Sequence, residues 1–230
     1  MKFMQTVQLP VFARPVPPYQ PPPEPLAIIY QDNEILVVDK PSGLLSVPGK
    51  QAGAEDCLQS RASAHHGGAE ITHRLDWDTS GLIVLALSRD ARRNLGSQFE
   101  TRHVEKHYVA RVWGHPVGKE GEIDLPLRCD WPNRPRQLVD HDQGKSALTR
   151  WQVQSADGEA STLLLKPKSG RTHQLRVHCA SMGHPILGDR LYAHEAAYHA
   201  HNRMCLHATH LSFDHPVDGR RMMFASLCPF

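Results

Sequence analysis

The sequence HRLDWDTSGLIVLAL occupies residues 73–87 and joins a polar loop directly to an apolar run. Residues Leu82–Leu87 are all apolar and mostly aliphatic, a pattern that predicts a buried strand. The loop before them carries two carboxylates, Asp76 and Asp78. A loop held at a strand end is a common support for functional side chains. From spacing alone, the two carboxylates could be a catalytic pair, a metal site or turn caps.

Short strands and a few helices surround this run in the sequence. Apolar runs at Ala27–Tyr30 and Ile35–Lys40 are separated by polar residues and predict a hairpin. Ser88 is an N-cap candidate for a helix from Arg89 to about Arg102. Many short strands with few helices predict an α+β fold with a mixed, mainly antiparallel β-sheet and flanking helices and loops. The remaining predicted elements are strands at Lys106–Trp113, Leu148–Val153, Thr162–Lys166, Leu206–Leu211 and Met222–Leu227, and a helix at Thr172–Met182.

The first 25 residues differ from the rest of the chain in composition, because they contain eight of the 18 prolines. Proline lacks a backbone donor and fixes φ, so this segment cannot build a helix or a central strand. We therefore predict an extended arm at residues 1–25 and one globular domain at residues 26–230. The arm could bind a partner or lie passively on the domain.

The net charge of +2 does not by itself indicate a nucleic-acid binder, but the charges are unevenly distributed. Residues 160–188 contain no Asp or Glu. A local basic field can recruit a polyanion even when the whole protein is nearly neutral. The alternative is a solvated face that happens to lack acidic residues. The basic side chains of this stretch are Lys166, Lys168, Arg171 and Arg176, with His173, His178 and His184 beside them.

Five scattered cysteines without CxxC spacing suggest free thiols in a reducing compartment. No apolar run approaches membrane-spanning length, and residues 1–10 lack the apolar core of a signal peptide, so we expect a cytoplasmic protein without membrane contact. The 16 histidines raise the possibility of a metal site. Their spacing includes no HExxH pattern and no Cys/His cluster, so we predict no metal.

Residues 170–178 form a second candidate site. On the predicted helix, His173 and Arg176 are three residues apart and would project from one face. Arg176 would lie at the edge of buried surface, where a guanidinium needs an acidic partner or a phosphate. Asp76 is one possible partner, and a structural ion pair with another carboxylate is the alternative.

Two further segments carry aromatic side chains suited to base stacking. Tyr108 alternates with Ala110 and Val112 on one strand face, so it could be a core residue or stack on a base at a pocket edge. Residues 129–137, CDWPNRPRQ, combine Trp131 with two arginines and two prolines. A stiff, exposed, cationic and aromatic loop of this kind suits contact with phosphates and bases, although it could also be a hairpin tip.

Together these segments resemble the RluA family of pseudouridine synthases over most of residues 26–230. Four motifs occur in the family's order, which makes the resemblance specific. They are Asp39–Leu44, the segment His73–Gly81 followed by Leu82–Leu87, Lys106–Ala110, and Gly170–His178 with Gly183–Asp189.

The resemblance implies an isomerase that converts uridine in RNA to pseudouridine without a cofactor, on a sheet built around a central RNA-binding cleft. It implies that Asp76 is the essential catalytic residue, that Arg176 pairs with it and that Tyr108 lies against the uracil. A base flipped out of its stack leaves a space, which Arg74 would fill or brace. The side chains expected to contact RNA are Arg74, Trp131, Arg134, Arg136, Lys168, Arg171 and His173.

Several family members carry an S4-like RNA-binding domain ahead of the catalytic domain, whereas here only the proline-rich arm precedes it. Residues Val109–Pro116 and Leu125–Gln137 resemble members that act on both 23S ribosomal RNA and the anticodon stem-loop of certain tRNAs. The implied function is therefore dual, and a family enzyme with a single RNA target is the alternative. Rivals of other classes are a non-catalytic RNA-binding protein and a histidine-rich metallohydrolase. We expect a monomer, since every amphipathic stripe has an intramolecular use.

Overall fold

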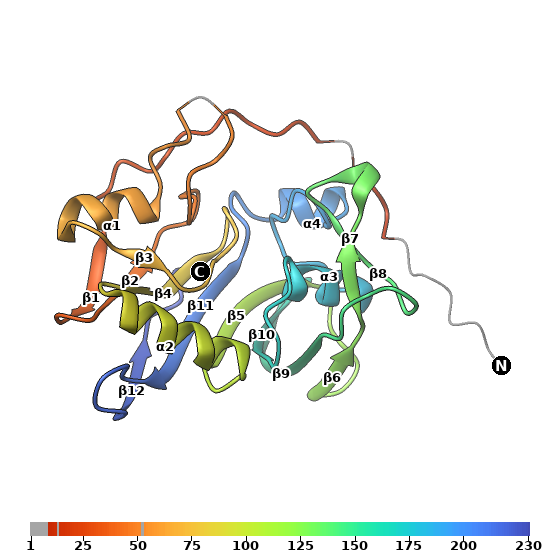
Figure 1. Ribbon diagram of the computed structural model, residues 1–230. Helices are drawn as coiled ribbons and strands as arrows, with labels where there is room; N and C mark the ends of the chain where they lie inside the picture. The colour runs from red at the N-terminus through yellow and green to blue at the C-terminus, as the bar shows by residue number, and fades with distance from the viewer. Residues whose placement is uncertain (1–8, 13, 52) are drawn as a thin grey trace. The chain divides into compact units, whose positions relative to one another are not determined.

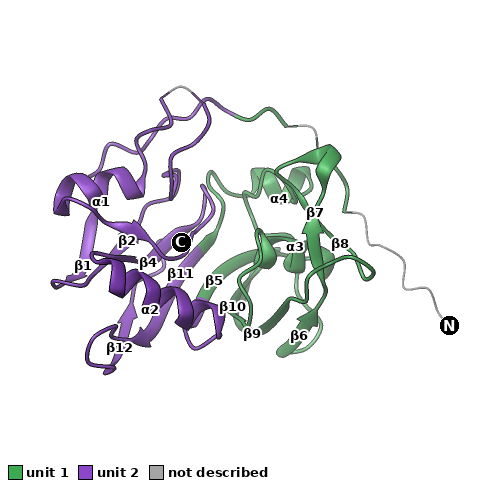
Figure 2. Ribbon diagram, viewed as in Figure 1, with its two compact units in different colours: residues 1–16, 108–206 green, residues 17–107, 207–230 purple. Residues whose placement is uncertain are grey.

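The computed structural model describes residues 9–12, 14–51 and 53–230 (Figure 1). The chain divides into two compact units (Figure 2). Unit 1 comprises residues 1–16 and 108–206, and unit 2 comprises residues 17–107 and 207–230. Each unit is therefore built from segments that are distant in the sequence.

Unit 2 contains a sheet in the order β1-β2-β4-β11, with β3 paired to β4 and β12 paired to β11. The β2–β4 pair is antiparallel, whereas the β4–β11 pair is parallel. Gly81 permits that parallel contact, because a Cβ there would meet the backbone of Ala208. The strands are β1 (Ala27–Gln31), β2 (Ile35–Lys40), β3 (Glu70–Ile71), β4 (Ser80–Ala86), β11 (Leu206–Asp214) and β12 (Arg221–Ala225).

Helix α2 (Arg89–Glu100) covers an apolar face of this sheet. Its Ala91 and Leu95 pack into a core with β2 and β4 residues such as Val37 and Val84. The helix begins where Ser88 Oγ accepts a hydrogen bond from Ala91 N–H at 3.1 Å, as the sequence predicted. Unit 2 also contains α1 (Leu58–His66), whose N-cap residue is Cys57.

Unit 1 contains most of β5 (Glu105–Trp113) in an antiparallel sheet of order β5-β10-β9-β6. A separate antiparallel pair, β7–β8, lies on either side of residues 130–136, which include Trp131. The other elements are β6 (Glu120–Asp124), β7 (Leu127–Cys129), the 3₁₀ turn η1 (Trp131–Asn133), β8 (Gln137–Val139), β9 (Leu148–Asp157), β10 (Ala160–Pro167), α3 (Gln174–Ser181) and α4 (Glu195–His199).

The predicted α+β class with a mixed, mainly antiparallel sheet is confirmed, and every predicted strand is present with small shifts at its ends. The predicted start of the helix at Thr172 is wrong: α3 begins at Gln174, because His173 has left-handed backbone with φ of 54°. Helix α1 was not predicted, because only Leu58 and Ala62 in it are buried and it has no apolar stripe. Across the described ranges, no helix is both long and apolar enough to cross a bilayer.

Candidate active site

The loop between β3 and β4 carries Asp76 and is tied to β4 through side chains. Thr72 Oγ1 donates to Val84 O at 2.8 Å, and Val84 N–H donates to His73 Nε2 at 3.1 Å. These two bonds continue the β3–β4 pairing after the backbone has left the sheet. The His73 ring also stacks on Phe99 at 4.4 Å. Burial, together with the charge of Lys106, lowers the pKa of His73 to about 3, so it stays a neutral acceptor at physiological pH.

The backbone on both sides of Asp76 is held by residues that follow β2. Ser46 Oγ donates to Leu75 O at 2.7 Å and accepts from Leu75 N–H at 3.2 Å. Gly43 N–H donates to Trp77 O at 3.0 Å, and Trp77 Nε1 donates back to Gly43 O at 2.7 Å. Each such bond contributes about 1 kcal/mol net, so together they fix the direction from which the partly buried Asp76 leaves the chain.

Lys40 is the central cation of this support, and it is fully buried. Its Nζ donates to Leu44 O at 2.7 Å, to Pro41 O at 2.9 Å and to Trp77 O at 3.2 Å. A buried ammonium is tolerated only with such partners. Lys40 therefore joins the segment after β2 to the residue that follows Asp76.

The side chains of Arg74 and Asp76 have different environments. Arg74 is exposed, Leu75 between them is buried, and Asp76 is partly buried. Asp76 O also accepts a hydrogen bond from Thr79 N–H at 3.1 Å, which closes the turn into β4. The structure thus leaves Arg74 accessible to a large ligand on a loop whose backbone is fixed.

Tyr108 and Arg176, the other two predicted catalytic residues, belong to unit 1. Tyr108 lies opposite Leu165 in the β5–β10 pair and is partly buried. Arg176 lies on α3 and is only 3% exposed. Because Asp76 belongs to unit 2, its pairing with Arg176 stays a prediction.

Arg176 forms a two-pronged ion pair with Asp189. Its Nε and Nη2 donate to the two carboxylate oxygens at 2.7 and 2.8 Å. Burial alone would raise the pKa of Asp189, but the adjacent Arg176 charge and its hydrogen bonds lower that pKa below its ordinary value. The structural ion pair that the sequence left open therefore exists, and it fixes the Arg176 guanidinium.

Tyr192 connects Arg176 to two of the predicted RNA-binding residues. Its ring lies 5.2 Å from the Arg176 guanidinium carbon and 4.7 Å from that of Arg136. Its hydroxyl accepts from Gln137 N–H at 2.8 Å and lies 2.8 Å from His173 Nδ1. The expectation that His173 and Arg176 share a helix face is wrong, because His173 precedes the helix, but both contact Tyr192.

The loop Trp131–Arg136, here called the Trp131 loop, presents one aromatic and one cationic side chain to solvent. Trp131 is 64% exposed, and the exposed Arg134 places its guanidinium carbon 4.6 Å from the Trp131 ring. The prediction that Arg136 is also exposed is wrong, because it is only 4% exposed. Its guanidinium packs on Tyr192, and its Nη2 donates to Pro10 O of the arm at 2.8 Å.

Fewer basic side chains of residues 160–188 are both exposed and charged than the sequence suggests. Lys168 is exposed, and Arg171 is partly buried with Nε donating to Ser146 O at 3.2 Å. His178 is fully buried, and burial lowers its pKa to about 4, so it carries no charge at neutral pH. With Arg176 paired to Asp189, the exposed Lys168 and the partly buried Lys166 and Arg171 remain as cations of this stretch, and Lys168 and Arg171 are the predicted RNA contacts among them.

Within residues 9–12, 14–51 and 53–230, no group of three or more His, Cys, Asp or Glu side chains is arranged so that it could hold a metal ion. In unit 2 the Asp76 loop offers a carboxylate, the Arg74 guanidinium and the neutral imidazole of His73, and in unit 1 Tyr108 offers a phenol and Arg176 a fixed guanidinium.

The sequence of residues 34–181 matches the family described as RNA pseudouridylate synthase. The chain belongs to this family. It is an isomerase that acts on RNA. The match includes Asp76, Tyr108 and Arg176, so all three predicted catalytic residues lie in the part of the chain that carries the family pattern.

Individual relatives match nearly the full chain. The protein called dual-specificity RNA pseudouridine synthase RluA is 50% identical in Escherichia coli K12, over 92% of this chain and 98% of the relative. Its namesake in Yersinia pestis is 52% identical, over 86% of this chain and 97% of the relative.

Solved structures agree with this family. Human RNA Pseudouridylate Synthase Domain Containing 1 superposes with a TM-score of 0.75 at 32% identity, covering 89% of this chain and 84% of the human chain. Human RNA Pseudouridylate Synthase Domain Containing 4 gives a TM-score of 0.71 at 26% identity, covering 88% of each chain.

Sequence reasoning missed the residues that support the site. Lys40 and Ser46 were part of, or close to, a recognised motif, but no periodicity indicates which backbone groups their side chains bind. Tyr192 follows the Gly183–Asp189 motif and carries no local signal. A search for buried polar residues near the motifs could have found Lys40, but Tyr192 is identified only by its contacts.

Proposed function

We propose that this enzyme isomerises uridine in both 23S ribosomal RNA and the anticodon stem-loop of tRNA, with Asp76 as the essential residue. Support for dual specificity comes from relatives named dual-specificity synthases that match over 86–92% of this chain. The observation that carries the role of Asp76 is the backbone support around it, in which Ser46 and Gly43 hold its two neighbours. A catalytic carboxylate must be aimed as well as ionised.

The reaction breaks the N1–C1′ glycosidic bond, turns the uracil and joins C5 to C1′. C5 then loses its proton and N1 gains one, so the product is an isomer of the substrate. Asp76 either attacks as a nucleophile or removes a sugar proton, and both routes need its ionised form. Arg176 keeps Asp76 ionised in this proposal, since an adjacent cation favours a charged carboxylate. The Asp189 pair holds the Arg176 guanidinium in one orientation for that task.

Tyr108 packs against the uracil and takes part in the loss of the C5 proton. Extrusion of the target base costs a few kcal/mol. Arg74 braces the space that the base vacates, which agrees with its exposure on the fixed loop.

RNA contact outside the reacting base falls mainly to the Trp131 loop. Stacking of one base on an aromatic ring contributes about 1–3 kcal/mol. Trp131 and Arg134 suit this role, because both are exposed and Arg134 is held over the ring. Lys168, Arg171 and His173 add phosphate and polar contacts, whereas Arg136 supports the loop from beneath.

We propose further that the enzyme acts as a monomer and in the cytoplasm, where both RNA substrates are available. Pseudouridine mapping of total RNA from cells with and without the gene tests the substrates. In cells without the gene, we expect pseudouridine to be lost at a position in 23S ribosomal RNA and at a position in tRNA anticodon stem-loops. Loss in only one RNA class would establish the single-target alternative, and unchanged maps would contradict the proposal. Light scattering of the purified chain should give a mass near 25.8 kDa.

A further inference from the structure

The proline-rich arm makes specific contacts along its described residues. Residues 9–12 and 14–25 contain no helix or strand, so side-chain contacts hold this segment in place. Its part up to Val16 belongs to unit 1, and its part from Pro17 onward belongs to unit 2. One anchor residue lies in each part: Arg14 in unit 1 and Tyr19 in unit 2.

Tyr19 is anchored beside the support of Asp76. Its hydroxyl donates to Asp56 O at 2.7 Å and accepts from Leu45 N–H at 3.2 Å. Its ring packs edge-on against Trp77, with 5.5 Å between the ring centroids. Desolvation raises the pKa of Tyr19 above its ordinary value, so the hydroxyl stays protonated and can make both bonds.

Two of the three contacts of Tyr19, those with Leu45 and Trp77, lie next to Asp76 or to a residue that holds its loop. Leu45 precedes Ser46, which holds the backbone of Leu75, and Trp77 directly follows Asp76. The Tyr19 ring thus restrains Trp77, the largest side chain of the Asp76 loop. Its hydroxyl restrains the segment that holds this loop.

A second tie secures the arm near Tyr19. Arg61 donates to Pro22 O at 2.7 Å and to Glu24 O at 2.8 Å. The same guanidinium is held by both carboxylate oxygens of Asp56, at 2.6 and 2.8 Å. Because Asp56 O also accepts from Tyr19, these residues form one connected set of contacts.

Arg14 is the anchor in unit 1, and its side chain is 10% exposed. It donates to Ala193 O at 2.9 Å, to Arg190 O at 3.1 Å and to Glu195 Oε1 at 2.6 Å. Its guanidinium carbon also lies 4.2 Å from the ring of Tyr198. These contacts hold the backbone on both sides of Tyr192.

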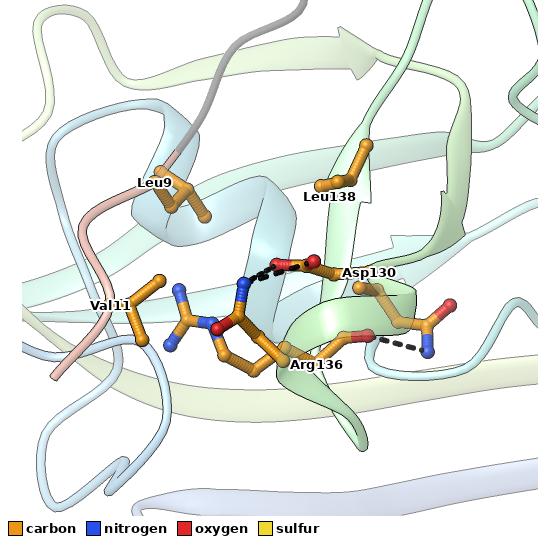
Figure 3. A pocket seen from close by; sticks show the side chains of 7 residues that line it. Leu9, Val11, Asp130, Arg136 and Leu138 are labelled. Atoms are coloured by element: carbon orange, nitrogen blue, oxygen red, sulfur yellow. Dashed lines mark hydrogen bonds between the residues drawn. The ribbon is translucent and has the colours of Figure 1, made fainter. Parts of the chain in front are cut away.

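The arm also reaches the Trp131 loop directly. Pro10 O accepts the one hydrogen bond that the Arg136 side chain makes within the described residues, since Arg136 Nε and Nη1 have no partner there. Figure 3 shows the Arg136 side chain extended toward Val11 of the arm. Leu9 and Val11 line one wall of a cavity of about 70 Å³ whose other walls come from the Trp131 loop and β8.

We propose that the arm is a working part of the enzyme, in which Tyr19 positions the Asp76 loop for catalysis and Arg14, through Tyr192 and Arg136, positions the Trp131 loop for RNA binding. This inference rests on the proposed roles of Asp76 and the Trp131 loop. Both are positioning residues, because neither is assigned a contact with RNA. The two anchors therefore have separable kinetic consequences, one in kcat and one in KM.

Steady-state kinetics of the full-length chain on a tRNA anticodon stem-loop tests the first anchor. Tyr19→Phe keeps the ring but removes both hydroxyl bonds, and we expect kcat to fall about fivefold with an unchanged KM. Tyr19→Ala should lower kcat further. Tyr30→Phe is the matched control, because it also loses a hydroxyl bond, to Asp32 at 2.9 Å, but on β1. Equal kcat values for Tyr19→Phe and Tyr30→Phe would overturn the proposal that Tyr19 positions the Asp76 loop.

The second anchor is tested by Arg14→Gln, with Arg93→Gln as the control for loss of an exposed arginine ion pair. We expect Arg14→Gln to raise KM about fivefold at constant kcat, because the Trp131 loop is held less firmly. Trp131→Ala should raise KM by itself, and adding Arg14→Gln to it should have no further effect. Independent, multiplicative effects would overturn the second anchor.

The same variants distinguish two outcomes: that the arm does not position the loops, and that the loops do not have the proposed functions. If Trp131→Ala leaves KM unchanged, the proposed role of the loop fails. If Trp131→Ala raises KM but Arg14→Gln does not, the positioning role alone fails. Thermal melting of each variant serves as the folding check. Tyr19→Phe, which retains the packed ring, gives the result for the first anchor if Tyr19→Ala does not fold.

Discussion

The Asp76 loop and the Trp131 loop are held in place in different ways. The Asp76 loop is fixed by its neighbours in one unit: β2 supplies Lys40, the segment after β2 supplies Gly43 and Ser46, and β4 supplies Val84. The Trp131 loop is closed on itself by hydrogen bonds among Asp130, Asn133 and Arg136. Its contacts with the rest of unit 1 come mainly from Tyr192 and the arm, which are distant in the sequence. The loop proposed for chemistry is thus bonded to neighbouring segments of its unit, whereas the loop proposed for RNA binding is closed on itself and contacts its unit mainly through Arg136.

This difference suits the two tasks. A reacting carboxylate must be placed within a fraction of an ångström, which many short hydrogen bonds can achieve. A loop that contacts two different RNAs benefits from exposed side chains and from fewer bonds to the rest of its unit. The comparison also predicts that damage to the Asp76 support costs stability and turnover together, whereas damage to the Trp131 loop mainly costs affinity.

The largest expected effect on stability comes from Lys40→Met. It removes three hydrogen bonds to one buried and two partly buried carbonyl groups, so the free energy of unfolding should fall by about 3 kcal/mol, with kcat also reduced. Urea denaturation and single-turnover kinetics measure the two quantities. Lys50→Met is the control, since Lys50 is exposed. Matching values for both variants would show that Lys40 does not support the loop.

Acid should destabilise unit 1 through His178. Burial lowers the pKa of His178 to about 4, whereas an unfolded histidine has a pKa of 6.5. The unfolded chain therefore binds a proton first, so the free energy of unfolding falls as pH drops from about 6.5 to 4, by up to about 3 kcal/mol.

Denaturation across this pH range should show a shallower loss for His178→Asn than for the natural chain. His66→Asn, at an exposed position, should leave the pH dependence unchanged. An unaltered pH dependence in His178→Asn would mean that His178 is not the neutral, buried group that the structure shows.

Trp131→Ala should weaken binding of the stem-loop by about 1–3 kcal/mol, because it removes one stacking surface. The free energy of unfolding should stay nearly unchanged, since Trp131 is exposed. Equilibrium binding by fluorescence anisotropy checks the first value and urea denaturation the second. A stability loss without an affinity loss would reverse the comparison between the two loops.

The smallest expected effect separates the two arginines of the Trp131 loop. Arg134→Ala should reduce the slope of log affinity against log salt by about 1, as for the loss of one phosphate contact. Arg136→Ala should lower stability instead, because Arg136 is buried on Tyr192. Binding titrations at several salt concentrations distinguish the two. An equal change of slope for both arginines would place Arg136 in the RNA interface after all.

Much of the fold could be predicted because its signals are local. The hairpin β1–β2, the capped helix α2 and the apolar strand β4 each follow from a pattern within one short segment. The polar loop before β4 was also recognisable, and the family motifs singled out Asp76 within it. Helix α1 was missed because it buries only Leu58 and Ala62 and begins at an unusual N-cap residue, Cys57.

The remaining features depend on contacts between distant segments. Arg136 was expected at the surface because its neighbours Trp131 and Arg134 are exposed, yet Tyr192 and Pro10 cover it. His173 was expected on a helix face, yet its left-handed backbone directs it to Tyr192. No local pattern encodes these contacts, because their partners lie from 19 to 126 positions away in the sequence.

The central claim is that Asp76 performs the chemistry, and the direct measurement is single-turnover isomerisation of a tRNA stem-loop by Asp76→Asn and Asp78→Asn. The two carboxylates lie in the same loop, so each serves as the control for the other. We predict that Asp76→Asn binds RNA normally but slows isomerisation by at least about 10³-fold, while Asp78→Asn retains most activity. Comparable turnover by Asp76→Asn and the natural enzyme would contradict the account.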